Sequence, residues 1–368
     1  MEKAVDAAST WGLVKYYMKP IEIYLNMSGV TEIMVDRFDE IYIEKNGRID
    51  DVLAVFKSNA EVERLIEQMG NALNQPVHAD KFPILDARLP RENGRAGARI
   101  NANLSTVSTR GASITIRVFP QKILEANDLL SRGAMTDEML AFLRLAILCR
   151  CNVIVSGGTG SGKTTLINVL CSFIPAHERV VVIEDTAELQ IRAGQEKPRL
   201  VSMEAPRRKA ELNQDSQHLD MSFLLQNALR QRPDRIVVGE IRSPDAATSF
   251  LQAINTGHEG CMTTLHANST KDALARMEGL AAARNVGLPY EVVQSQVRGN
   301  VHLLIQQQKI LEPDNRVSRR IIEIAEMVEG EMKLLWSWDY KLKQHVNRGD
   351  VGQSNVIKTA ERFDISAK

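Results

Sequence analysis

Short β-rich runs and one helical pattern fill the first third of the chain. The β-rich runs cover 21–27, 32–35 and 41–44. Asn46-Gly47, which follows the third run, predicts a type I′ hairpin turn because both central residues need positive φ. Ser58 and Glu61 form a capping-box pattern in front of apolar residues at helical spacing, which predicts a helix. Apolar residues at every second position of 114–118 predict a strand with one buried face.

From residue 136 onward the pattern alternates between helices and buried strands. Thr136 is the predicted N-cap of a helix. The apolar runs that follow are nearly continuous, as expected for strands of a parallel sheet that helices cover on both faces. These runs cover 152–156, 180–184, 235–238, 261–265 and 301–305. The pattern therefore predicts an α/β protein with a smaller α+β domain at its N-terminus.

The change of pattern gives the predicted boundaries. They are an α+β domain over 1–120, a linker and hinge over 121–135, an α/β domain over 136–340 and a polar, frayed tail over 341–368. The stretch 192–220 is polar and is predicted to be a loop or a solvated hairpin. Its basic triplet, Arg207-Arg208-Lys209, lacks interleaved aromatic residues, so we interpret it as a solvated surface rather than a nucleic-acid contact.

A phosphate-binding loop is predicted between the first strand of the α/β domain and the helix that follows. The run Gly157-Gly158-Thr159-Gly160-Ser161-Gly162-Lys163-Thr164 fits the pattern G-x-x-x-x-G-K-[ST], and Thr165 continues into the helix. Glycines let the backbone wrap around phosphate oxygens, and the helix N-terminus adds its dipole. We expect Lys163 to neutralise the β- and γ-phosphates of ATP and Thr164 to offer its hydroxyl to Mg²⁺. The alternative is a glycine-rich turn without a ligand.

Acidic partners of such a loop are expected at the carboxyl ends of neighbouring strands. Glu184 closes the predicted strand 180–184, and Glu240 follows the strand 235–238. Either carboxylate could position the attacking water or complete the Mg²⁺ shell. Gly239 stands where the Walker B aspartate is usual, so we expect Glu240 to orient water or to reach Mg²⁺ indirectly. The alternative for either glutamate is a helix cap or a surface carboxylate.

Two histidines flank the predicted strand 261–265. His266 follows this strand at the edge where the γ-phosphate is expected, so it could sense that phosphate or shape the site. His258 precedes the strand and is expected at the opposite edge. For both histidines a structural role is the alternative.

Charge and composition exclude several classes of protein. The chain has 46 Lys plus Arg and 46 Asp plus Glu, so strong non-specific attraction to nucleic acid is not expected. The first residues lack the apolar core of a secretory signal, and the most apolar window, 139–155, is interrupted by charges. We therefore expect a cytoplasmic protein without a transmembrane segment that reaches a membrane through partners. Four cysteines in 368 residues do not indicate a disulfide framework.

Four motifs together resemble those of the secretion ATPases, the hexameric traffic ATPases of type IV secretion, type II secretion and related pili. They are the phosphate loop, the acidic box 183–186, the segment 232–242 and the histidine box 256–269. The resemblance spans about 21–328 and includes N-terminal segments around Arg99 and Arg117. The metal-binding cysteine motif common in type II secretion ATPases is absent from the sequence, which favours the conjugation and tight-adherence pilus branch.

This resemblance implies a RecA-like P-loop core, ATP and Mg²⁺ as cofactors and a homohexameric ring on an inner-membrane secretion or pilus platform. It implies that Glu184 and Glu240 serve hydrolysis and that His258 and His266 belong to the histidine box. It also implies that Arg99 and Arg117 contact the phosphates of the nucleotide. The alternation around Ile116 agrees, because it places Arg117 on the opposite face from the core.

Two other functions remain open from the sequence. One is a nucleic-acid translocase on the same RecA-like core. The neutral net charge argues against it, and so does the lack of a basic stripe with stacking aromatic residues. The other is a nucleotide-sensing scaffold that binds ATP and barely hydrolyses it, with Gly239 in place of the aspartate. ATPase stimulation by single-stranded DNA and steady phosphate release would separate the three functions.

Overall fold

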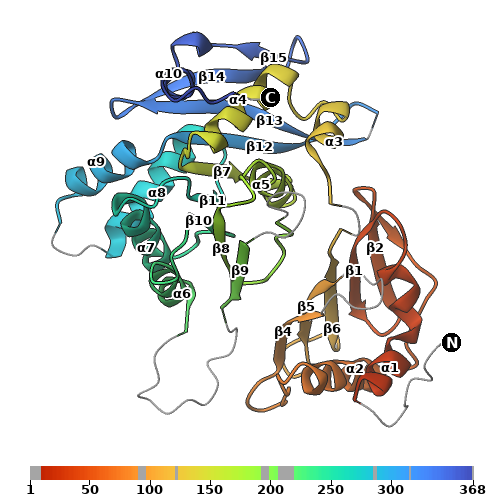
Figure 1. Ribbon diagram of the computed structural model, residues 1–368. Helices are drawn as coiled ribbons and strands as arrows, with labels where there is room; N and C mark the ends of the chain where they lie inside the picture. Colours follow the sequence, from red (N-terminus) through yellow and green to blue (C-terminus); the bar gives the residue numbers. More distant parts are fainter. Residues whose placement is uncertain are drawn as a thin grey trace. The chain divides into compact units, whose positions relative to one another are not determined.

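The computed structural model describes residues 10–89, 97–120, 123–191, 199–205, 219–284, 288–314 and 316–366. The chain divides into two compact units, Met1–Lys122 and Ile123–Lys368, and each is described by itself (Figure 1).

The first unit is an antiparallel sheet in the order β3-β2-β1-β6-β5-β4 with two helices. The helices are α1 (Thr10–Leu25) and α2 (Asn59–Ala72); the strands are β1 (Val30–Arg37), β2 (Glu40–Lys45), β3 (Arg48–Asp51), β4 (Ile84–Leu89), β5 (Ala98–Asn103) and β6 (Ser113–Val118). Ile33, Ile100 and Ile116 lie side by side across three strands, and all three belong to the buried core that α1 and α2 complete. Their strand neighbours therefore line the opposite, polar face.

Local signals in this unit are mostly confirmed. Asn46 and Gly47 have φ of 53° and 83°, as the predicted hairpin requires. Helix α2 begins directly after Ser58, but the Ser58 side chain makes no capping hydrogen bond. The Glu61 carboxylate instead accepts a hydrogen bond from the backbone N–H of Lys57 at 2.6 Å.

The predicted strand at 21–27 is wrong, because most of this segment belongs to α1. Val14, Met18, Ile21 and Leu25 are all buried. Their spacing of three to four residues places them on one helical face. Packing of this face against α2 and the sheet therefore outweighs the β preference of the isoleucines and tyrosines.

The second unit is a nine-stranded sheet in the order β15-β14-β13-β12-β7-β11-β10-β8-β9. Pairing is parallel from β12 to β9 and antiparallel from β12 to β15. Its strands are β7 (Val153–Gly157), β8 (Arg179–Glu184), β9 (Arg199–Glu204), β10 (Arg235–Val238), β11 (Met262–Leu265), β12 (Leu303–Leu311), β13 (Val317–Val328), β14 (Glu331–Asp339) and β15 (Gln344–Asn347). Its helices are α3 (Ala126–Ser131), α4 (Asp137–Leu148), α5 (Lys163–Cys171), α6 (Met221–Ala228), α7 (Pro244–Asn255), α8 (Thr270–Arg284), α9 (Tyr290–Asn300) and α10 (Asn355–Arg362), with a short 3₁₀ turn over Val351–Gln353.

The parallel strands are buried on both faces, as their apolar runs predict. Val180 and Val182 pack into the core under α4 and α5, whereas Val181 and Ile183 pack into the core under α6, α7, α8 and α9. The Thr136 hydroxyl accepts a hydrogen bond from Met139 N at 3.2 Å, which confirms the predicted N-cap of α4. The α/β fold class is therefore confirmed. Among the described residues, no helix has the length and apolar character that crossing a bilayer requires.

The polar stretch 192–220 contains a strand that the sequence pattern did not reveal. Within it, β9 pairs in parallel with β8 at the edge of the sheet. An edge strand is only partly covered, so its polar side chains are tolerated and its apolar signal is weak. The basic triplet 207–209 lies outside the described residues.

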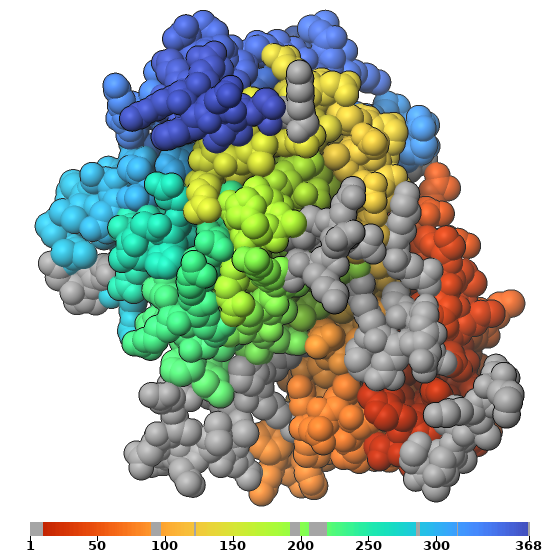
Figure 2. All heavy atoms as spheres, in the orientation of Figure 1, coloured from red at the N-terminus to blue at the C-terminus, as the bar shows by residue number. Residues whose placement is uncertain are grey.

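The C-terminal segment is not frayed, contrary to expectation. Val356 and Ala360, four residues apart, are buried, and Val356 joins the core under α4. In Figure 2 the C-terminal residues, in dark blue, lie against the yellow segment that contains α4. The remaining residues of α10 are mostly polar and face solvent, which is why composition alone suggested a tail. The range predicted as a linker, 121–135, likewise contains α3, and its Leu129 belongs to the same core.

Candidate functional site

The phosphate loop connects the end of β7 to the start of α5. Gly157 (φ 156°), Gly160 (φ 68°) and Gly162 (φ 96°) have backbone angles that favour glycine. A Cβ on Gly157 would lie 2.2 Å from the carbonyl oxygen of Gln307, so this position has no room for a side chain. The loop therefore has its wrapped conformation because β12 passes directly beside it.

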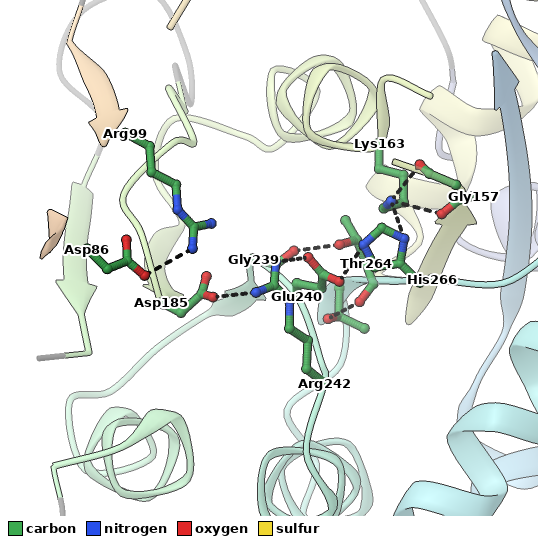
Figure 3. A network of polar contacts seen from close by, with 12 residues as sticks. Asp86, Arg99, Gly157, Lys163, Asp185, Gly239, Glu240, Arg242, Thr264 and His266 are labelled. Atoms are coloured by element: carbon green, nitrogen blue, oxygen red, sulfur yellow. Dashed lines mark hydrogen bonds and ion pairs between the residues drawn. The ribbon is translucent and has the colours of Figure 1, made fainter. Parts of the chain in front are cut away.

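Lys163, the first residue of α5, has its ammonium group inside this loop. Its Nζ donates to the carbonyl oxygens of Gly157 and Gly158 at 2.9 and 3.0 Å, and it lies 3.4 Å from His266 Nδ1 (Figure 3). The side chain is buried, which strengthens the interaction of its charge with an anion. Thr164 and Thr165 follow in the first turn of α5 and are partly exposed.

A chain of polar contacts continues from Lys163 across the strand tips. His266 Nε2 lies 3.0 Å from Glu240 Oε1, at ion-pair distance but outside hydrogen-bond geometry. The second oxygen of Glu240 accepts from Arg242 Nη2 at 2.7 Å, and Arg242 Nη1 donates to Asp185 at 3.0 Å. The carboxyl ends of β8, β10 and β11 are thus joined to the phosphate loop (Figure 3).

The neighbouring charges and burial set the protonation states of Glu240 and His266. Burial by itself would raise the pKa of Glu240, but the hydrogen bond and charge of Arg242, together with the charge of Lys163, lower the pKa below its ordinary value. Burial and the nearby Lys163 ammonium lower the pKa of His266. Glu240 is therefore ionised and His266 neutral at pH 7. A neutral His266 can accept from Lys163 at Nδ1 while Nε2–H faces Glu240.

Glu184 is the last residue of β8, the strand that pairs with β10 in front of Glu240. It is 2% exposed, and one carboxylate oxygen accepts from the backbone N–H groups of Glu188 and Leu189, each at 2.9 Å. Burial raises its pKa to about 7, although these two hydrogen bonds act in the opposite direction. A Cβ on Gly239 would lie 2.9 Å from Glu184 Cγ. A side chain at position 239 would therefore collide with Glu184.

His258 is not brought to this cluster. It precedes β11 at the opposite end of the strand from His266, and its ring nitrogen lies 3.4 Å from the Thr256 hydroxyl. Its carbonyl oxygen accepts a contact from Cys261 Sγ at 3.1 Å. These contacts favour the alternative of a local structural role at the turn before β11.

Arg99 and Arg117 belong to the first unit and lie side by side on its polar face. They are paired in register across β5 and β6, and Arg88 on β4 continues the row. Arg117 forms an ion pair with Glu32 at 2.8 Å, and Arg99 lies 3.4 Å from Asp86. The register therefore places three arginines in a row, two of them beside carboxylates.

Several buried oxygen atoms at the strand tips make no hydrogen bond within the described residues: Ser161 Oγ, Glu184 Oε2, Thr186 Oγ1, Glu240 Oε1 and Gln307 Oε1. Buried polar atoms are normally paired, so such a group around a phosphate loop fits a site that binds a polar ligand. The described residues contain no cluster of three His, Cys, Asp or Glu side chains that could hold a metal by themselves.

Two residues at this site were missed by the sequence analysis. Arg242 lies two residues after Glu240 inside a motif that was recognised, so its proximity to the carboxylate could have been anticipated. Arg319 on β13 donates to the carbonyl oxygen of Gly160 at 2.8 Å. It lies 159 residues from that glycine, and no local signal indicated the contact.

Comparison with known proteins identifies the family. The model of the type II/IV secretion system protein family matches residues 16–346, so the chain belongs to this family. An uncharacterized protein of Methanocaldococcus jannaschii is 37% identical over 249 residues, which cover 66% of this chain and 33% of that longer protein. The probable conjugal transfer protein TrbB of Sinorhizobium fredii is 34% identical over 315 residues, covering 85% of this chain and 88% of that one.

The fold is also that of a solved structure. The ATPase DotB of Legionella pneumophila is 20% identical, with a TM-score of 0.61, and the match covers 99% of this chain and 90% of that one. The predicted family and the RecA-like core with an N-terminal domain are confirmed.

Proposed function

We propose that this chain is an ATP-hydrolysing motor that powers conjugation, type IV secretion or pilus assembly. Family membership and the TrbB relative support the class of machine. The single observation that carries the activity is the line of contacts from Lys163 through His266 to Glu240, which joins the phosphate loop to an ionised carboxylate. This arrangement combines an anion site with a group that can orient water.

Lys163 is the residue that responds first to ATP. Its ammonium donates to two loop carbonyls, and phosphate oxygens are stronger partners because they are charged. Glu240 stays ionised and orients water for in-line attack on the γ-phosphorus, which releases phosphate and ADP. His266, neutral and between the two, senses whether the γ-phosphate is present.

Mg²⁺ would be held by the Thr164 hydroxyl and, through water, by Glu240. When bound, it neutralises charge that develops on the phosphates. Glu184, at the end of the strand next to β10, has a pKa of about 7 and can hold or release a proton near neutral pH. Arg99 and Arg117 remain predicted phosphate contacts, and His258 a predicted member of the histidine box.

We further propose that six copies form a ring at the cytoplasmic side of the inner membrane, attached through platform proteins. The relative named as a conjugal transfer protein supports a secretion or conjugation machine. Loss of the γ-phosphate would open each subunit after hydrolysis, which converts turnover into relative motion of its parts. Mass photometry with and without ATP and Mg²⁺ tests the ring, and a monomer under both conditions contradicts it.

Phosphate release and nucleotide binding test the activity. Glu240→Gln should retain ATP binding and slow hydrolysis about 10²- to 10⁴-fold. Lys163→Ala should weaken binding itself, measured by calorimetry. Glu331→Gln, which changes an exposed carboxylate on β14, serves as the control and should hydrolyse ATP like the wild type. Equal turnover in Glu240→Gln and wild type contradicts the role of Glu240, and stimulation by single-stranded DNA would favour a translocase.

A further inference from the structure

Strand β13 carries two neighbouring arginines that reach two different parts of the second unit. Because side chains alternate along a strand, Arg319 and Arg320 lie on opposite faces of β13. Each makes a hydrogen bond to a backbone carbonyl of a segment far away in the sequence. No motif of the family resemblance assigned a role to either of them.

Arg319 forms a hydrogen bond to Gly160 in the middle of the phosphate loop. Its Nε donates to the carbonyl oxygen of Gly160 at 2.8 Å, and its Cδ lies 3.3 Å from the position of a Cβ on Gly162. Gly160 has a φ of 68° and nothing near its Cβ position, so its own packing does not restrain it. Since the peptide bond is planar, holding this carbonyl also fixes the direction of the N–H of Ser161.

Arg320 holds the turn at the end of α3. Its Nη1 donates to the carbonyl oxygen of Gly133 at 2.7 Å, and its guanidinium lies 4.4 Å from the centre of the Trp338 ring. Ile321, the next residue, donates its backbone N–H to Ala134 at 2.9 Å. The turn between α3 and α4 is therefore attached to the same strand as the phosphate loop.

We propose that Arg319 is a positioning residue for the phosphate loop, and that β13 transmits the state of this loop to the end of α3. The proposal rests on the proposed function of the loop as the phosphate site. Arg319 pre-orients the loop for phosphate by restraining a glycine that would otherwise sample many conformations. A change in the loop on nucleotide binding shifts Arg319, and the adjacent Arg320 and Ile321 carry the shift to 133–134.

Nucleotide affinity tests the positioning role. Arg319→Ala should raise the Kd for ATP about three- to tenfold, the range expected for one exposed charge-assisted hydrogen bond, with kcat at saturating ATP nearly unchanged. Arg319→Lys keeps the charge and one donor and should fall between Ala and wild type. Arg316→Ala removes an exposed arginine of the same hairpin that pairs with Asp314, and should bind like the wild type.

Each alternative outcome has a distinct meaning. If Arg319→Ala binds ATP with wild-type affinity, the positioning role is overturned. If Arg319→Ala loses as much ATP affinity as Lys163→Ala, Arg319 is a direct ligand of the nucleotide, which also overturns the positioning role. If Lys163→Ala itself binds ATP normally, the proposed function fails, whatever Arg319 does. Circular dichroism of the purified variants shows whether each is folded.

Hydrogen exchange tests the transmission. ATP should change the exchange rates of α3 amides in wild type and in Arg316→Ala. At ATP concentrations that saturate it, Arg319→Ala should lose most of this change, because its loop is no longer attached to β13. An equal change in Arg319→Ala and wild type, or none in wild type, would overturn the transmission.

Discussion

The buried carboxyl of Glu184 should make the stability of the second unit depend on pH. Its pKa is about 7 in the folded protein against an ordinary value of 4.5. Between these two pH values the native state holds a proton on Glu184 that the unfolded chain does not hold. The free energy of unfolding therefore falls as the pH rises from 4.5 to 7 and stays low above pH 7.

Glu184→Gln removes this dependence with little change in shape. The amide oxygen can still accept from the N–H groups of Glu188 and Leu189, and the side chain stays neutral at every pH. The difference in pKa corresponds to about 3 kcal/mol. The variant should therefore match the wild type near pH 4.5 and exceed its stability by an amount of this order at pH 8.

Urea unfolding at pH 5 and pH 8 measures the effect. Trp336 is buried in the core of the same unit, so its fluorescence reports on unfolding there. Subtracting wild type from variant at each pH cancels other titrating groups. Glu331→Gln, which removes an exposed carboxylate of the same unit, is the control and should give the same difference at both pH values. A Glu184→Gln difference that does not grow with pH would refute the reasoning.

Two further substitutions, each with a matched control variant, test packing in the second unit. Gly239→Ala should destabilise this unit by roughly 1–3 kcal/mol, because the new Cβ would meet Glu184 Cγ. The control, Gly279→Ala, lies inside α8 with open space around it and should stabilise the unit by about 0.5–1 kcal/mol. Equal effects of the two variants in urea unfolding would contradict the prediction. Val356→Ala should lower the free energy of unfolding by roughly 1–3 kcal/mol because Val356 of α10 belongs to the core. Its control, Lys358→Ala on the exposed face of α10, should change this free energy by no more than about 0.5 kcal/mol. An equally small change in Val356→Ala would mean that the C-terminal segment does not contribute to folding.

Comparison of the predicted site with the observed one shows what spacing can reveal. The phosphate loop was predictable because all its residues are contiguous and each has a local task. Glu240 and His266 each follow a parallel strand, and the carboxyl ends of parallel strands share one edge of the sheet. Their proximity to the phosphate loop was therefore predictable. His258, in the same sequence box, begins the strand instead of ending it, and therefore lies at the other edge.

The sequence by itself determined the elements with strong local signals: the Asn46-Gly47 turn, the Thr136 cap, the loop before Lys163 and the apolar strands between helices. Tertiary structure decided whether 21–27 continued a helix, whether polar residues formed the edge strand β9, and that α10 packs on α4. It also decided that Glu184 fills the space beside Gly239 and that Arg319 reaches Gly160. These outcomes depend on contacts between residues far apart in the chain, whose packing outweighs local propensities of a few tenths of a kcal/mol per residue.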